Sequence, residues 1–174
     1  MKHRHWIYGL IIAFILGIAA WTVRATPILQ SRPQLSPEHQ SLRGLGVVRV
    51  DVPPIRGDLT QLGVTTEHVA KVFKEEIQLA GFQILDDPHV PLIRLVAFSN
   101  HDEDQPEALA ITFVIAFHQE ISVKRIDQDL WAPTAFFSQT KLTTRQEAHD
   151  RIDWYLRKAT ARVMRIASFA SEIE

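Results

Sequence analysis

The sequence predicts an α+β protein: a mostly antiparallel four- to five-stranded sheet with two helices packed on one face, preceded by an N-terminal membrane helix. Three observations lead to this prediction. An uninterrupted apolar run extends from Trp6 to Val23. Hydrophobic residues alternate over residues 109–123, as in a long half-buried strand. Two further segments, residues 66–80 and 144–170, repeat hydrophobic residues at three- and four-residue steps, as amphipathic helices do.

The N-terminal segment, residues 1–25, is a signal anchor or a signal peptide. Lys2 and Arg4 precede an apolar run of about 18 residues, which reaches the lower limit for spanning a bilayer. We therefore expect residues 6–23 to cross the inner (cytoplasmic) membrane once, with the C-terminal domain in the periplasm. The alternative is secretion to the periplasm after cleavage near Ala25.

Residues 26–45 form a predicted Pro-rich linker, because Pro27, Pro33 and Pro37 stand among few large apolar residues. The predicted α+β domain covers residues 46–170. Its first strand is Val47–Val52, where β-branched and charged residues alternate before two prolines. A helix then begins at Thr65 or Thr66 and stops at Gly81.

The second half of the domain is predicted as strands followed by one long helix. Residues 82–85 form a short strand, and residues 92–98 are apolar enough for a central one. The strand at residues 109–123 is long enough to need a bend or bulge. Its antiparallel partner is expected at residues 131–139, where Pro133 marks an edge or bulge. Capping boxes start the last helix, whose exposed face is basic and carries Arg145, Arg151, Arg157, Lys158, Arg162 and Arg165.

Composition excludes several classes of protein. A formal net charge of −1 argues against nucleic-acid binding. The absence of cysteine excludes disulfides, thiol catalysis, thiolate metal sites and a lipid-modified N-terminal cysteine. The basic helix face could bind anionic lipid, although we expect an ordinary solvated face, since acidic residues interrupt it.

No residue is predicted to be catalytic, cofactor-binding or metal-binding, and no enzymatic activity or cofactor is expected. The best candidate for a metal site is Asn100–Asp104, where carboxylates stand beside His101; we interpret it as an acidic, solvated hairpin loop. The scattered histidines are expected to have surface or structural roles, including His68, His89, His118 and His149.

Several short motifs resemble a family of small uncharacterised exported bacterial proteins. The likeness covers about Val47 to Val163, and Gln78 and Phe136-Phe137 depart from the family pattern. The resembling motifs are Gly63–Glu67, Glu75-Glu76, Leu79–Leu85, Phe117–Ile121, Trp131–Thr134 and Ile152–Leu156. The resemblance implies an α+β fold and an exported location, and no activity. The order of elements also resembles the modules of TolB-type (N-terminal domain) and LptE-type envelope proteins.

Two functions remain open on the sequence. The first is a non-catalytic, membrane-tethered interaction module, an accessory subunit that binds an envelope or membrane protein partner through a sheet edge. The alternative is a periplasmic carrier of a small ligand or lipid. Its cleft would lie between sheet and helices and be lined by Phe113, Phe117, Phe136 and Phe137.

Overall fold

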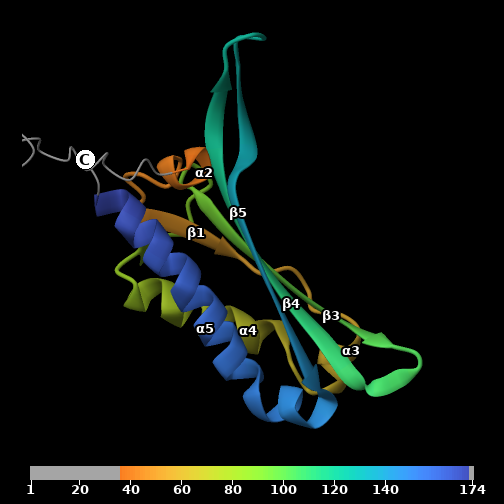
Figure 1. Cartoon of the computed structure of the whole chain (residues 1–174). Helices are drawn as coiled ribbons and strands as arrows, with labels where there is room; N and C mark the ends of the chain where they lie inside the picture. The colour runs from red at the N-terminus through yellow and green to blue at the C-terminus, as the bar shows by residue number, and fades with distance from the viewer. Residues whose placement is uncertain (1–35, 173–174) are drawn as a thin grey trace, which may run out of the picture. The chain divides into compact units, whose positions relative to one another are not determined.

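The computed structural model describes residues 36–172, and it confirms the α+β class (Figure 1). The predicted membrane segment, residues 6–23, lies outside this range, and no helix within residues 36–172 is long and apolar enough to cross a membrane. The elements follow in the order α2 (Pro37–Gln40), β1 (Val47–Asp51), α3 (Asp58–Gln61), α4 (Thr66–Leu79), β2 (Gln83–Ile84), β3 (Leu92–Asp102), β4 (Gln105–Val123), β5 (Gln128–Thr144) and α5 (Arg145–Glu172).

The sheet is mixed, with parallel pairs at β1 that the prediction of a mostly antiparallel sheet did not include. Its five strands lie in the order β2-β1-β3-β4-β5. β1 pairs in parallel with both β2 and β3, whereas β3, β4 and β5 form antiparallel pairs. The parallel pairing of β1 with β2 follows from the helices α3 and α4 between them, because a crossover returns the chain to the end at which β1 began.

The two long helices begin and end as their sequences predict. The Thr65 side chain caps α4 by accepting a hydrogen bond of 3.2 Å from the His68 amide, and Gly81 follows the helix with a φ of 91°. Thr144 caps α5 in the same way, accepting a bond of 3.2 Å from the Glu147 amide. Short polar side chains at these positions satisfy amides that have no partner inside the helix.

The core lies between one face of the sheet and the helices α4 and α5. The alternation predicted for β4 is confirmed, since its inner residues are almost completely buried: Leu109, Ile111, Phe113, Ile115 and Phe117. The predicted bulge is also present. Phe117 pairs with Ala135 and His118 with Pro133, so Thr134 is the extra residue on β5.

The packed unit begins upstream of the predicted boundary at residue 46. Residues 37–40 form α2, and both Leu42 and Leu45 are buried in the core. The Gln119 amide also donates a hydrogen bond of 2.8 Å to the Ser41 carbonyl. Part of the predicted linker is therefore folded. Composition alone does not reveal this, because the two buried leucines stand in an otherwise polar stretch of sequence.

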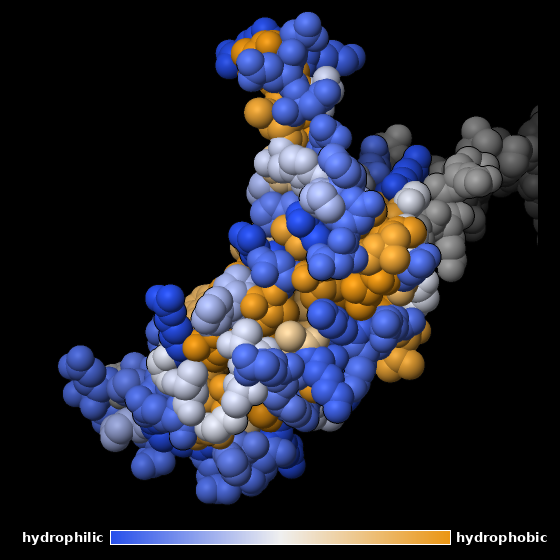
Figure 2. Space-filling view, turned by 180° about the vertical axis from the view of Figure 1, so that it is seen from behind, coloured by the Kyte–Doolittle hydropathy of each residue, from blue (hydrophilic) through white to orange (hydrophobic). Residues whose placement is uncertain are grey.

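Beyond the bulge, β4 and β5 continue as a two-stranded hairpin that projects from the rest of the domain (Figure 1). Seen from behind, hydrophobic side chains gather over the middle of the domain, whereas the projecting end is mostly hydrophilic (Figure 2). Val96, Phe98 and Phe136 are exposed hydrophobic side chains of β3 and β5. They alternate with the buried positions of these strands, so they belong to the sheet face away from α4 and α5.

Candidate functional site

The most distinctive feature of the domain is the open edge of its sheet at β5. β5 is 17 residues long and pairs only with β4 among the described strands. The opposite edge, β2, has just two residues. Alternate residues of an edge strand direct their backbone N–H and C=O groups away from the sheet, where another strand can pair with them.

Burial decreases sharply from β4 to β5 on the inner face of the sheet. Ile115 and Phe113 on β4 are each 2% exposed. Their partners across the ladder, Phe137 and Gln139, are only half-buried, and Lys141 is exposed. α5 therefore covers β4 fully and β5 in part. The layer of side chains between sheet and helix is incomplete on its β5 side.

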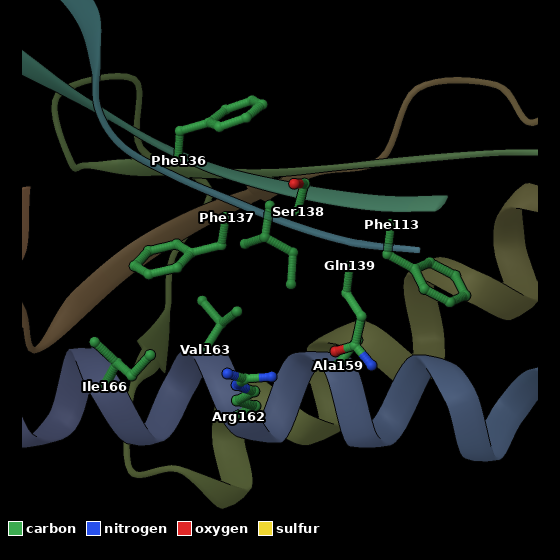
Figure 3. Close-up of a pocket in the computed structure, with 10 residues that line it drawn as sticks. Phe113, Phe136, Phe137, Ser138, Gln139, Ala159, Arg162, Val163 and Ile166 are labelled. Atoms are coloured by element: carbon green, nitrogen blue, oxygen red, sulfur yellow. The ribbon is translucent and has the colours of Figure 1, made fainter. Parts of the chain in front are cut away.

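A cavity of about 250 Å³ occupies this incomplete layer, and we call it the β5–α5 groove. Phe137 and Gln139 extend from β5 toward α5, while the ring of Phe136 lies on the opposite side of the strand (Figure 3). The residues that line the groove are Phe113, Ile115, Phe136, Phe137, Ser138, Gln139, Ala159, Arg162, Val163 and Ile166. Its walls are thus mainly hydrophobic, with one cation.

That cation, Arg162, is exposed and forms no ion pair with any residue of the described range 36–172. Three other basic residues of α5 are neutralised. The pairs are Arg145–Asp58 at 2.9 Å, Arg157–Glu75 and Arg157–Glu76 at 2.7 Å each, and Arg151–Glu147 at 3.5 Å. Half of the six basic residues predicted for this face therefore form ion pairs, which weakens its interpretation as a lipid-binding surface.

Of the predicted acidic loop Asn100–Asp104, only Glu103 and Asp104 form the turn between β3 and β4, because β3 extends to Asp102. The histidine of this segment, His101, is engaged within the domain. The His101 ring Nδ1 lies 3.0 Å from Oδ2 of Asp58, whose other carboxylate oxygen accepts a bond of 2.9 Å from Arg145. These hydrogen bonds, the one with His101 foremost, hold the pKa of Asp58 below its usual value although burial opposes them. Asp58 joins α3, the β3–β4 hairpin and α5.

Sequence reasoning did not single out Asp58, because its partners lie far away along the chain. The Gly57-Asp58 pair at a helix start was the only local signal. Among the side chains that the structure describes, which do not include Asp102, no hydroxyl group bonds to the other nitrogen of the His101 ring, and no three potential metal ligands converge. The geometry of this cluster supports a structural role.

Two further histidines, His68 and His149, contact neighbouring elements of the domain. His68 Nε2 lies 2.7 Å from an Asp153 carboxylate oxygen and so links α4 to α5. His149 Nδ1 lies 3.1 Å from the Leu62 carbonyl oxygen. Burial, together with the positive charge of the nearby Arg94, lowers the pKa of His118 on β4.

The four phenylalanines proposed to line a ligand cleft are only partly brought together. Phe113 and Phe137 face the β5–α5 groove, whereas Phe136 is 61% exposed and its ring points away. Phe117 is fully buried behind Phe137, with their rings edge to face at 6.0 Å. At about 250 Å³ the groove is slightly smaller than the roughly 300–1,000 Å³ of typical small-molecule sites.

The fold is that of a small α+β domain whose sheet has an open edge at β5. No family model and no curated protein matches the chain. Similar solved structures include a minor lipoprotein from Acinetobacter baumannii, with 11% identity, a TM-score of 0.36, and 72% of this chain and 91% of that chain covered. The PelC dodecamer from Paraburkholderia phytofirmans has 10% identity and a TM-score of 0.41, with 75% and 89% covered. Rare lipoprotein B from Shewanella oneidensis has 8% identity and a TM-score of 0.35, with 70% and 89% covered.

Proposed function

We propose that this chain is a non-catalytic interaction module, exported and tethered to the membrane, that serves as an accessory subunit of a cell-envelope or membrane protein complex. The observation that carries this proposal is the open β5 edge beside a half-filled groove. A strand supplied by another protein would pair with β5 and complete the layer between sheet and helix.

The lack of protection along the middle of β5 supports a functional edge. Natural edge strands are usually blocked by prolines, bulges, lysines or a covering element. Here Pro133 and the bulge at Thr134 interrupt one end of the regular ladder, and Lys141 stands near the other. The backbone between them, residues 135–140, has no such protection and lies directly over the groove.

Membrane tethering rests on the N-terminal sequence. The apolar residues 6–23 and the basic start fit a single span of the inner membrane with the domain in the periplasm. Ion pairing of Arg145, Arg151 and Arg157 halves the number of basic residues that α5 offers to a lipid surface. We therefore assign membrane contact to the N-terminal segment, or export alone if the chain is cleaved near Ala25.

The test is affinity purification of the C-terminally tagged, full-length chain from its native membranes in mild detergent, followed by mass spectrometry. We expect a stoichiometric protein partner and an unprocessed bait mass. A photo-crosslinking benzoylphenylalanine placed at Thr140 on β5 should capture that partner, and one placed at the exposed Lys71 on α4 should not. A bait without any partner, or equal capture from both positions, would contradict the proposal.

A second candidate function is carriage of a small hydrophobic ligand, which the cavity lined by Phe113 and Phe137 favours. Native mass spectrometry of the same preparation distinguishes the two. A carrier would retain a small molecule whose mass disappears on denaturation, whereas an interaction module would retain a protein.

A further inference from the structure

We infer that the partner segment bound at β5 is an extended strand in which hydrophobic residues alternate and one acidic residue meets Arg162. This inference rests on the proposed function and specifies the chemistry of the partner. The observations that carry it are the composition of the groove and the unpaired charge at its wall.

The alternation follows from the geometry of a sheet. Successive side chains of an added strand would point to opposite faces, so every second one would enter the β5–α5 groove. There it would meet Phe137 from β5 and Val163 and Ile166 from α5. Hydrophobic side chains at those positions would bury the inner side chains of β5, which are now half-exposed. The inner side chains of β4 are already buried.

The acidic residue follows from Arg162. Its guanidinium stands at a mainly hydrophobic wall and has no carboxylate partner in the part of the chain that the structure describes. An added strand would partly desolvate this group, which is costly for an unpaired charge. A carboxylate on that strand would offset the cost, because arginine binds carboxylates through two parallel hydrogen bonds.

A second copy of this chain does not fit the groove as well. Pairing β5 with β5 of another copy through its unprotected stretch would present residues 135–140, which contain no aspartate or glutamate and are followed by Lys141. Two α5 helices with unpaired Arg162 residues would then lie on the same side of the joined sheet. Like charges facing each other disfavour that arrangement.

The N-terminal segment of the same chain is also a poor occupant on the basis of its sequence. Residues 24–35 contain Arg24 and Arg32 and no acidic residue. Pro27 and Pro33 each lack the amide hydrogen that a paired strand donates. An acidic, hydrophobic strand from a different protein therefore matches the groove better than either segment of this chain.

The experiment uses the full-length chain in its native membranes, with benzoylphenylalanine at Thr140 and with the cross-linked segment sequenced by mass spectrometry. Three variants are compared: Arg162→Glu, the conservative Arg162→Lys and the control Arg165→Glu. Arg165 carries the same charge on the same helix but borders a different depression, beside α4. Circular dichroism of each variant verifies that the fold is retained.

We expect cross-links to a segment of another protein with alternating hydrophobic residues and an aspartate or glutamate. Their yield should fall about tenfold in Arg162→Glu, less than threefold in Arg162→Lys, and by no more than about twofold in Arg165→Glu, since a charge-assisted bond contributes a factor of this order. Cross-links to a second copy, to residues 1–35, or to a segment without an acid would overturn the inference.

Equal yields from Arg162→Glu and Arg165→Glu would also overturn it. If a partner protein is nevertheless captured, the proposed function as an interaction module would still be supported. If the chain with an unsubstituted Arg162 forms no cross-links at all, that result would instead contradict the proposed function itself.

Discussion

Removal of the Asp58 carboxylate is the sharpest test of how α5 is held in place. Asp58 sits at the start of α3 and is largely buried, with its side chain 10% exposed. It binds Arg145 at the first residue of α5 and His101 on the β3–β4 hairpin. Substitution by alanine deletes both contacts without adding bulk.

The magnitude follows from these two contacts. Hydrogen bonds to charged groups contribute about 1.5–3 kcal/mol each in buried settings. The Arg145 and His101 side chains are 26% and 40% exposed, so solvent screening lowers each value to about 1 kcal/mol. We expect Asp58→Ala to lower the free energy of unfolding by about 2 kcal/mol. With an unfolding entropy of about 2.1 cal/mol/K per residue taken over residues 36–172, this loss of stability lowers Tm by roughly 7 °C.

The assay is thermal unfolding followed by far-UV circular dichroism, arranged as a double-mutant cycle with Asp58→Ala, Arg145→Ala and the double variant. We expect a coupling free energy of about 1 kcal/mol, since the two side chains contact directly. Asp129→Asn is the control, because Asp129 lies exposed on the projecting hairpin. Effects of Asp58→Ala and Arg145→Ala that add within about 0.3 kcal/mol would refute the reasoning.

The pH dependence gives a second check on the same residue. The pKa of Asp58 is lowered on folding, so its contribution to stability is complete above the unfolded carboxyl pKa of about 3.9. That contribution is lost as the pH falls through the lower pKa of the folded state. The stability difference between the unsubstituted chain and Asp58→Ala should therefore narrow below about pH 4. A difference that widens there would contradict this account.

Three further stability predictions use the same unfolding assay. Phe117→Ala should cost about 3–5 kcal/mol because the ring is fully buried, whereas Phe136→Ala should cost less than about 0.5 kcal/mol because its ring is 61% exposed; equal effects would contradict the assigned sheet faces. Gly81→Ala should cost about 1 kcal/mol, since φ is 91° and the new Cβ would meet no atom within 4 Å; a stabilising effect would exclude backbone strain as the cause. Thr65→Ala should cost about 1 kcal/mol through loss of the α4 cap, and Thr65→Ser should restore most of it.

Local periodicity alone was sufficient to predict most of the elements. The alternation on β4 and the helical stripes of α4 and α5 each depend on residues a few positions apart, so a short window of sequence contains them. The caps at Thr65 and Thr144 and the stop at Gly81 are equally local. The same holds for the bulge beside Pro133, which the length of β4 predicted.

Other features depended on residues far apart in the chain. The parallel pairing of β1 requires the crossover through α4, and strand direction leaves no mark on periodicity. Leu42 is buried because α2 folds beside β5, although the surrounding composition is typical of a linker. The Asp58 cluster likewise joins three segments that no local pattern relates.

The α+β class can be derived from the sequence by itself, because short-range periodicity determines it. Export and anchoring stay predictions that rest on the composition of the N-terminal segment. Only the tertiary structure decided which strand forms the open edge, and which basic residue of α5 lines the groove without an ion pair to any described residue. Both depend on how far α5 extends over the sheet. The extent of this cover depends on the packing of residues 113–141 against residues 159–166. The groove, with Arg162 at its wall, is formed only by these two segments together, so the sequence of either one does not predict it.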